Sequence, residues 1–286
     1  MRAGCFVGTG GALERATEHV RLAESLGYEA AYVSHIAGRE SLTVLTAFAL
    51  ATERIRLGTA VVPIYSRTPA TMAQTAATID DISHGRLNLG LGVSHRVVVE
   101  NWHGQSIDRP AAEMREYVAI VRAILRGESP PAGEKWHTSF HLMGLAPRPE
   151  LPVYIAALSP AMLRLAGEIG QGVLLWLCVP EYIEQVVVPE VRRGRERAGL
   201  PLEGFEIVPA VPCALTDDRT GVHEGLRGEL LTYFSLPFYR AMIERSGFSE
   251  EIASFDGAGG DPEAMKAAIS ERFLDALSGI GDEAAV

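Results

Sequence analysis

Two histidines follow apolar segments of the sequence and are the side chains best suited to proton transfer. His35 follows the segment at residues 28–34, and His95 follows the segment at 87–91. The charge of an imidazole changes near neutral pH, so a histidine at the end of a strand can act as a general acid or base. A histidine bonded to the backbone would produce the same pattern, so spacing alone leaves both interpretations open.

Two further groupings concern binding. His137 and His141 lie four residues apart, but a metal site there would need a helix and a third ligand, and the glycine, threonine and serine nearby favour irregular structure. No metal site is therefore expected. Ser159-Pro160 follows a strand-like segment and begins a helix, where free backbone N–H groups can bind a phosphate. An ordinary helix N-cap explains the same two residues equally well.

The glycine-rich segments do not match a dinucleotide-binding loop. The sequences GTG at 8–10 and GLG at 90–92 lack the third glycine of G-x-G-x-x-G, because Leu13 and His95 occupy that position. The sequence contains no G-x-S-x-G motif, which leaves a serine hydrolase without support. The glycines at 90 and 92 would instead relieve crowding in a sheet and let a flat ligand approach the backbone.

Composition excludes several classes of protein. The 286 residues carry 26 Lys and Arg against 36 Asp and Glu, and a net charge of −10 argues against a nucleic-acid binder. Three scattered cysteines without a C-x-x-C pair predict neither a disulfide framework nor a zinc knuckle. The start does not resemble a signal peptide, and no run approaches the roughly 18 apolar residues of a membrane span. We therefore expect a cytoplasmic protein that binds neither nucleic acid nor membranes.

Short apolar segments alternate with segments of helical periodicity along the chain. Because most of the apolar segments are continuous, both faces of a parallel sheet are expected to be buried. The order predicts a single α/β domain over 1–286, a TIM-type (β/α)8 barrel, with a helical insertion or tail over about 216–286. Its functional site should lie where the strands end. The expected strands are residues 3–7, 28–34, 55–62, 87–91, 152–157, 172–179 and 205–215.

Four segments together resemble a known family. They are 55–60 (IRLGTA), 67–70 with 80–92 (DDISHGRLNLGLG), the polar and aromatic loop expected at 101–104 with 108–110 and the helix at 115–117, and 152–160 (PVYIAALSP). In order and spacing over about residues 1–215 they resemble the bacterial luciferase-like barrel superfamily, in the branch that uses the deazaflavin coenzyme F-420. The combination is specific, although no single segment is.

The resemblance implies a barrel with the coenzyme at the carboxyl ends of the strands. It implies a non-prolyl cis peptide at Ala60-Val61 behind the deazaflavin ring, and a coenzyme phosphate held by the N–H groups of Leu158 and Ser159. His35 falls on the histidine that relatives place near the hydride-carrying carbon, and His95 would assist it. The coenzyme contacts implied are Ser34, His35, Thr59, Ala60, Val61, Gly92, Val93, Ser94, Ala157, Leu158 and Ser159.

The sequence departs from the family pattern at several places. Ser34 and His95 stand where some sugar-phosphate dehydrogenases of the family have Asp and a catalytic Glu, so that activity is not expected. The segment 136–149, which would form a substrate lid, is shorter than usual. The family also continues beyond 281–282 with a helix and an eighth strand. We therefore expect either a shortened sequence or an incomplete barrel.

The leading hypothesis is an oxidoreductase that moves a hydride between coenzyme F-420 and a small organic substrate. Reduction of an unsaturated or imine substrate and oxidation of an alcohol both stay open. The alternatives are an FMN-dependent monooxygenase on the same barrel and a flavin- or deazaflavin-binding protein without turnover. A homodimer is expected, because association is common in the resembled family and an exposed strand edge favours it.

Overall fold

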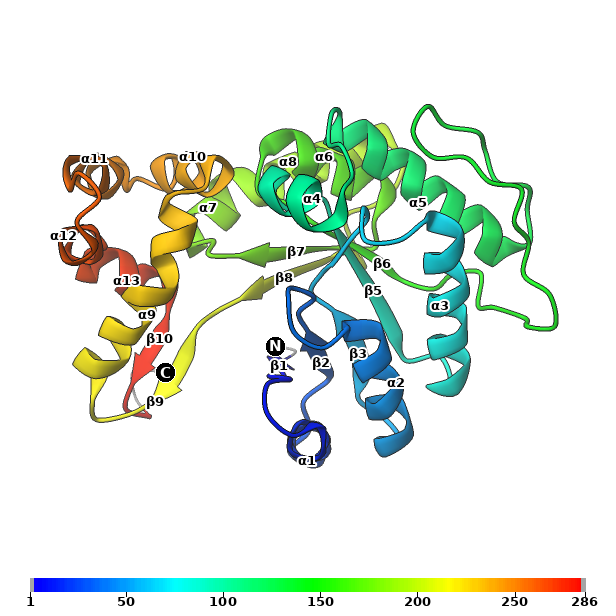
Figure 1. The fold of residues 1–286 in the computed structure, drawn as a ribbon, viewed down its shortest axis with the longest axis horizontal. Coiled ribbons are helices and arrows are strands. Elements are labelled where there is room, and N and C mark those ends of the chain that lie inside the picture. Colours follow the sequence, from blue (N-terminus) through cyan, green and yellow to red (C-terminus); the bar gives the residue numbers. More distant parts are fainter. Residues whose placement is uncertain (1–2, 284–286) are drawn as a thin grey trace. The chain divides into compact units, whose positions relative to one another are not determined.

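Parallel strands and helices alternate along the chain in the computed structural model, which describes residues 3–283 (Figure 1). The main sheet has the order β1-β2-β3-β5-β6-β7-β8, which is the order of the chain, and β4 pairs with β5. Chain order with helical crossovers is the arrangement of (β/α) barrels, so the predicted fold class is confirmed. The strands are β1 (Gly4–Phe6), β2 (Ala30–Val33), β3 (Arg56–Thr59), β4 (Val62–Pro63), β5 (Leu87–Gly92), β6 (Val153–Ala156), β7 (Gly172–Trp176) and β8 (Glu206–Ala210).

The chain divides into two compact units by its internal contacts. Within the described residues, the first unit comprises 3–156 and 169–173, and the second comprises 157–168 and 174–283. The single domain predicted over 1–286 stays a prediction. No helix formed by residues 3–283 combines the length and the apolar character that a membrane span requires.

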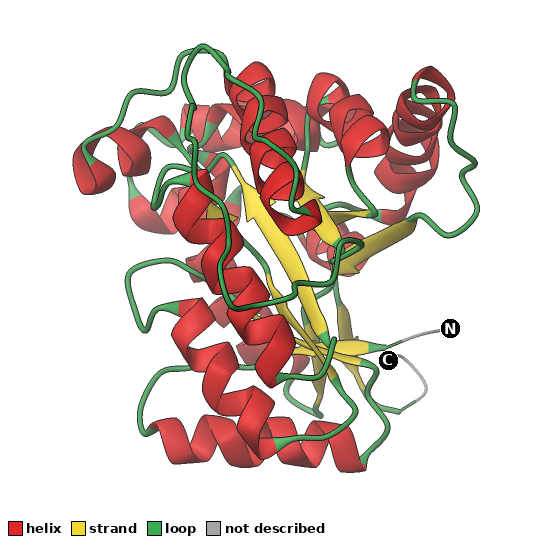
Figure 2. Cartoon of the chain, turned by 90° about the vertical axis from the view of Figure 1, so that its right-hand side faces the viewer, coloured by secondary structure: helices red, strands yellow, loops and turns green. Residues whose placement is uncertain are grey.

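Helices lie along the strands of the sheet, as the red and yellow elements of Figure 2 show. In the first unit α1 packs on α2, α2 on α3 and α3 on α5. In the helix α3, Thr68 accepts a hydrogen bond from the Thr71 N–H and Pro69 stands in the first turn. The helix α5 carries an apolar stripe that is buried along its whole length. These helices are α1 (Leu13–Ser25), α2 (Ser41–Ala51), α3 (Pro69–Ile82), α4 (Arg96–His103) and α5 (Pro110–Arg126).

Two predicted strands are each divided in the structure. The segment expected at 55–62 forms β3 and β4, with a cis peptide between Ala60 and Val61. The segment expected at 205–215 forms β8 and β9 (Cys213–Leu215), and β9 pairs in parallel with β10 (Gly279–Gly281) as a separate two-stranded sheet. The polar and aromatic segment 101–104, expected as a loop, is mostly helical. The helix α4 continues to His103, and Gly104, with φ of 61°, is its C-cap.

The second unit contains the predicted helical tail, packed around aromatic side chains. Phe273 meets the rings of Phe234 and Phe248 edge to face, at centroid distances of 5.4 and 4.9 Å. The end of the predicted tail forms two helices, α12 and α13, because Ser270 accepts a hydrogen bond from the Phe273 N–H and caps the second one. The helices are α6 (Pro160–Ile169), α7 (Pro180–Tyr182) with a π-helical turn (Ile183–Val187), α8 (Val188–Arg197), α9 (Arg219–Phe234), α10 (Pro237–Arg245), α11 (Ser249–Gly257), α12 (Pro262–Ala267) and α13 (Glu271–Leu277).

The charged residues of the segment 80–92 join elements at the amino end of β5. The buried Asp80 carboxylate accepts hydrogen bonds from Arg148 Nε at 3.0 Å and Nη2 at 2.8 Å, and from the Leu87 N–H at 3.2 Å. The Arg86 guanidinium donates to the carbonyl oxygens of Ala49 and Thr52, at 2.9 and 3.0 Å, where α2 ends. This part of the family-like segment therefore stabilises the fold at the end of the strand opposite to the expected site.

We predict that Asp80→Ala lowers the free energy of unfolding by about 2–3 kcal/mol, because Arg148 and a buried backbone N–H lose their partner. Urea unfolding followed by fluorescence measures the change. The neighbouring, exposed Asp81 provides the matched control, and Asp81→Ala should change stability by less than about 0.5 kcal/mol. Equal effects of the two substitutions would contradict this account of Asp80.

Candidate active site at the carboxyl ends of β2, β3 and β5

The parallel register brings most of the predicted site residues to one end of the first unit. Val33, the last residue of β2, pairs with Thr59, the last residue of β3, and the Ala60 N–H donates to the Val33 carbonyl at 2.9 Å. β3 in turn pairs with β5. The structure therefore places at the same ends of neighbouring strands three of the predicted groups, Ser34-His35, Thr59-Ala60-Val61 and Gly92-Val93-Ser94-His95.

His35 follows β2, and one of its ring nitrogens is held by protein groups. Nδ1 lies 3.0 Å from Ser41 Oγ and 3.5 Å from Glu40 Oε1. Among residues 3–283, Nε2 has no hydrogen-bond partner, and the side chain is 12% exposed. The imidazole is thus oriented from one edge, and its other nitrogen is available for proton transfer. Ser34, one residue earlier, is exposed.

Glu40 is a charged group beside His35 that the sequence analysis did not identify. It is the N-cap of α2 and accepts hydrogen bonds from the N–H groups of Leu42 and Thr43. Arg67 Nη2 lies 2.8 Å from its Oε1. Burial raises the pKa of Glu40, but hydrogen bonds from His35, Thr43 and the helix N–H groups outweigh it and hold the pKa far below its usual range. An acidic residue five positions after the histidine, just before an apolar helix, was the available signal.

The Thr59 side chain forms its hydrogen bonds within the sheet. Its side chain is wholly buried, and its hydroxyl donates to the Gly90 carbonyl at 2.7 Å and accepts from the Gly90 N–H at 2.9 Å. A ligand at this position would therefore meet the backbone around Thr59 and not its hydroxyl. The predicted role of Thr59 as a coenzyme contact stays a prediction.

The cis peptide lies at Ala60–Val61, the position that the family resemblance implied. Val61 lies directly over Gly92 at the end of β5, since a Cβ added to Gly92 would be 2.5 Å from Val61 Cγ2. The glycine is thus required by this close approach. The Gly92 carbonyl also accepts from the Ile64 N–H at 2.9 Å, which connects the chain after the cis peptide to β5.

The chain after Gly92 turns sharply into α4. Val93 and Ser94 are half-buried, and Ser94 adopts the left-handed conformation with φ of 60°. His95 is the N-cap residue of α4, and burial lowers the pKa of its imidazole. At neutral pH His95 is therefore a neutral group, suited to hydrogen bonding or to accepting a proton.

Ala157, Leu158 and Ser159 belong to the second unit, where they lead into α6. Ser159 Oγ accepts from the Met162 N–H at 3.3 Å, which confirms its role at the start of this helix. The Leu158 carbonyl accepts from the Tyr182 hydroxyl at 2.6 Å. Within residues 3–283 the backbone N–H groups of Leu158 and Ser159 donate to no acceptor. Two free donors at the positive end of a helix suit an anionic group.

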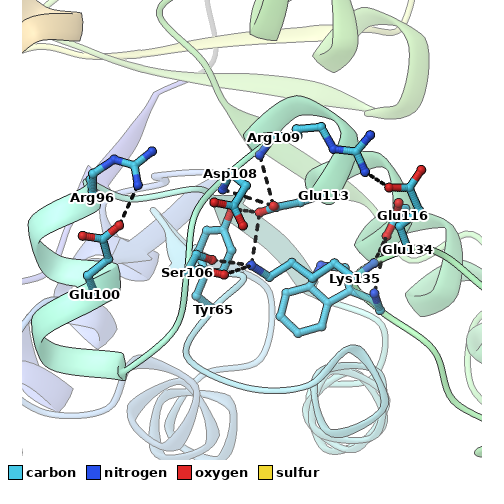
Figure 3. A network of polar contacts seen from close by, with 11 residues as sticks. Tyr65, Arg96, Glu100, Ser106, Asp108, Arg109, Glu113, Glu116, Glu134 and Lys135 are labelled. Atoms are coloured by element: carbon cyan, nitrogen blue, oxygen red, sulfur yellow. Dashed lines mark hydrogen bonds and ion pairs between the residues drawn. The ribbon is translucent and has the colours of Figure 1, made fainter.

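A second polar network surrounds Glu113 on α5 (Figure 3). Its buried carboxylate accepts from the Tyr65 hydroxyl and from the N–H groups of Asp108 and Arg109, at 3.2 and 3.1 Å. Lys135 Nζ lies 3.6 Å from the same carboxylate and donates to Ser106 in the loop before α5. The network therefore anchors the loop before α5 and the segment after it to one buried charge.

Among the described residues, one group has the geometry of metal ligands. His223, Glu271 and Asp275, on α9 and α13, place their ligand atoms within 4.8 Å of one another. The two carboxylates already form ion pairs with Arg227 and Arg219. These ion pairs account for the cluster without a metal. His137 and His141 lie in irregular structure, as expected.

A parallel α/β sheet in chain order with helical crossovers is the arrangement of (β/α) barrels, a class of protein in which ligands bind at the carboxyl ends of the strands. The family model of luciferase-like monooxygenases matches residues 1–286. The chain therefore belongs to the luciferase-like monooxygenase family.

Several named proteins are similar to this chain. A Mycobacterium tuberculosis protein provisionally named a coenzyme F-420-dependent oxidoreductase is 31% identical, over 99% of this chain and 88% of that protein. The 5,10-methylenetetrahydromethanopterin reductase of Archaeoglobus fulgidus is 32% identical, over 82% of this chain and 70% of that protein. The structure of the coenzyme F-420-dependent tetrahydromethanopterin reductase from Methanopyrus kandleri has a TM-score of 0.80 at 24% identity, covering 100% of this chain and 87% of that one.

We predict that Gly92→Ala destabilises the protein by about 1–3 kcal/mol, because the new methyl group overlaps Val61. The double variant Gly92→Ala with Val61→Ala removes the overlapping methyl groups and should recover at least half of that loss. Urea unfolding of the two single variants and the double variant measures the coupling. Additive losses would show that the two side chains do not meet.

Glu113→Gln tests the anchoring network through its pH dependence. Burial raises the pKa of Glu113, but hydrogen bonds from Tyr65 and the two backbone N–H groups, with the charge of Lys135, lower it overall. A lowered pKa contributes stability that is present above the unfolded value of about 4.3 and is lost as the pH falls through the folded value.

The variant should therefore be less stable at pH 7, by about 2–3 kcal/mol, and the difference should shrink below about pH 4. Urea unfolding at both pH values measures it. Glu134→Gln, at an exposed ion pair with Arg109, is the control and should change stability by less than about 1 kcal/mol. A pH-independent difference would exclude the proposed charge effect.

Proposed function

We propose that this chain is an oxidoreductase that binds coenzyme F-420 at the carboxyl ends of its strands and moves a hydride between that coenzyme and a small organic substrate. The observation that carries the proposal is His35, which follows β2 beside the Ala60–Val61 segment after β3 and, within residues 3–283, is held at Nδ1 and free at Nε2. Relatives with names that include coenzyme F-420 support the choice of coenzyme.

The residues present fit such a coenzyme. Val61 and the residues Gly92, Val93 and Ser94 would border its ring, with Ser34, Ala60 and the Thr59 backbone beside them. Leu158 and Ser159, next to Ala157, lie in the second unit, where their N–H groups donate to no acceptor within residues 3–283, and their predicted contact with the coenzyme phosphate stays a prediction. When bound, the coenzyme supplies the hydride chemistry, and the protein supplies orientation and exclusion of water. These assignments are proposals.

The two histidines have different proposed roles. Nε2 of His35 accepts a proton from the substrate when the substrate is oxidised and donates one when it is reduced. His95, kept neutral by burial, holds a polar group of the substrate by a hydrogen bond. Both roles use nitrogens on side chains that are partly exposed at the strand ends.

An FMN-dependent monooxygenase is the second candidate, favoured by the description of the family itself. The two candidates differ in the coenzyme bound and in oxygen consumption. A protein that binds the coenzyme without turnover is the third. A homodimer and a cytoplasmic location stay predictions, and light scattering after gel filtration tests the former.

Titration of the purified protein with oxidised and reduced F-420 and with FMN, followed by tryptophan fluorescence, tests the proposal. We expect micromolar affinity for F-420, weaker binding of FMN, and hydride transfer with at least one substrate of an alcohol, imine and enone panel. Tight binding of FMN alone, with oxygen uptake, would establish the monooxygenase. F-420 binding without single-turnover hydride transfer would establish the binding protein.

We predict that His35→Asn lowers the rate of turnover by about 100-fold or more, because a general acid–base contributes about 10²–10⁴. The dissociation constant for F-420 should change by less than about threefold. His19→Asn, at an exposed histidine on α1, is the matched control and should leave the rate unchanged. An unchanged rate in His35→Asn would remove His35 from the mechanism.

A further inference from the structure

The start of α2 contacts a single edge of the His35 imidazole. Ser41 Oγ is 3.0 Å and Glu40 Oε1 is 3.5 Å from the same nitrogen, Nδ1. Ser41 is wholly buried, and its hydroxyl has no other hydrogen-bond partner among residues 3–283. This buried hydroxyl is therefore dedicated to the histidine.

The chemistry of these neighbours selects one tautomer. A hydroxyl can donate or accept a hydrogen bond, but an ionised carboxylate only accepts. A proton on Nδ1 has two acceptors beside it, Ser41 Oγ and the Glu40 carboxylate, whereas a lone pair on Nδ1 would face a negative charge. Nε2 then carries the lone pair, and within residues 3–283 it is the nitrogen without a protein partner. A metal ligand histidine is oriented by its other nitrogen in the same way.

Arg67 limits the effect of Glu40. Its Nη2 lies 2.8 Å from Oε1, the same oxygen that faces His35, and its position is held because the Tyr117 hydroxyl donates to its backbone carbonyl at 3.0 Å. The cation therefore offsets part of the negative charge that His35 senses. Arg39, in the loop between β2 and α2, donates to the Thr9 carbonyl.

We propose that Glu40 and Ser41 are positioning residues that keep the neutral His35 protonated at Nδ1, and that Arg67 shares the Glu40 carboxylate and limits its influence. A proton taken from a bound molecule then adds to Nε2, Nδ1 keeps its own proton, and the imidazolium formed faces the carboxylate. The return of that proton restores the starting state. The catalytic consequence rests on the proposed function, but the tautomer does not.

Histidine ¹⁵N NMR of the coenzyme-free protein tests the proposal directly. Wild type should show neutral His35 mainly as the Nδ1–H tautomer. Glu40→Gln should increase the share of the Nε2–H tautomer, since an amide N–H can donate to a lone pair on Nδ1, whereas the carboxylate only accepts. Arg67→Met should lower that share, since the carboxylate is then no longer shared with a cation. Ser41→Ala should increase the share of the Nε2–H tautomer.

Two variants separate this role from a general loss of helix capping. Thr43→Val removes another partner of Glu40 and keeps its charge, and Asp261→Asn weakens the N-cap of α12 in the second unit. Neither should change the tautomer ratio of His35. Thermal unfolding confirms that each variant is folded.

Turnover provides a second measurement, and Glu40→Gln should lower its rate in proportion to the lost share of the Nδ1–H tautomer, because only that tautomer has its lone pair on Nε2. A predominant Nε2–H tautomer in wild type, or an unchanged tautomer ratio in folded Glu40→Gln, would overturn the proposal. Absence of F-420 binding would contradict only the proposed function, because the NMR measurement contains no coenzyme.

Discussion

The reciprocal hydrogen bonds between the Thr59 hydroxyl and the backbone of Gly90 hold β3 to β5 at the level where the candidate site begins. Beyond this point the chain follows two different paths. On β3 it enters the cis Ala60–Val61 peptide, and on β5 it reaches Gly92, which leaves space for Val61. A shift in this pairing would displace the Ala60–Val61 peptide, Gly92 and the loop to His95 together. The geometry of the strand ends therefore depends on these hydrogen bonds.

Helix α2 is the second element on which the site depends, because both of its ends are bound by charged side chains. Arg86 donates to carbonyl oxygens at its carboxyl end, and Glu40 accepts from N–H groups at its amino end. Each charge also satisfies part of the helix dipole. His35 lies against the amino end that is held in this way, so the cap of the helix and the orientation of the imidazole use the same carboxylate.

Most of the first unit could be predicted from the sequence, since its strands are continuous apolar runs and α5 carries a regular apolar stripe. The division at residues 60–61 could not be read from periodicity, because Ala60, Val61 and Val62 are all apolar and mark no break. The family resemblance supplied it. Helix α4 was missed because His95 makes no side-chain cap and only Val99 is buried. Glu40 and Arg67 were missed because they are 27 residues apart in the chain and meet only in the folded protein.

The network around Glu113 has a mechanical consequence. The carboxylate belongs to α5, but its partners come from Tyr65 after β4, from residues 106–109 before the helix, and from Lys135 after it. If any one of these segments moved away, the buried negative charge would keep fewer hydrogen-bond donors, and the folded state would be less stable. The separate segments are thereby coupled, because each depends on the others to stabilise the same carboxylate.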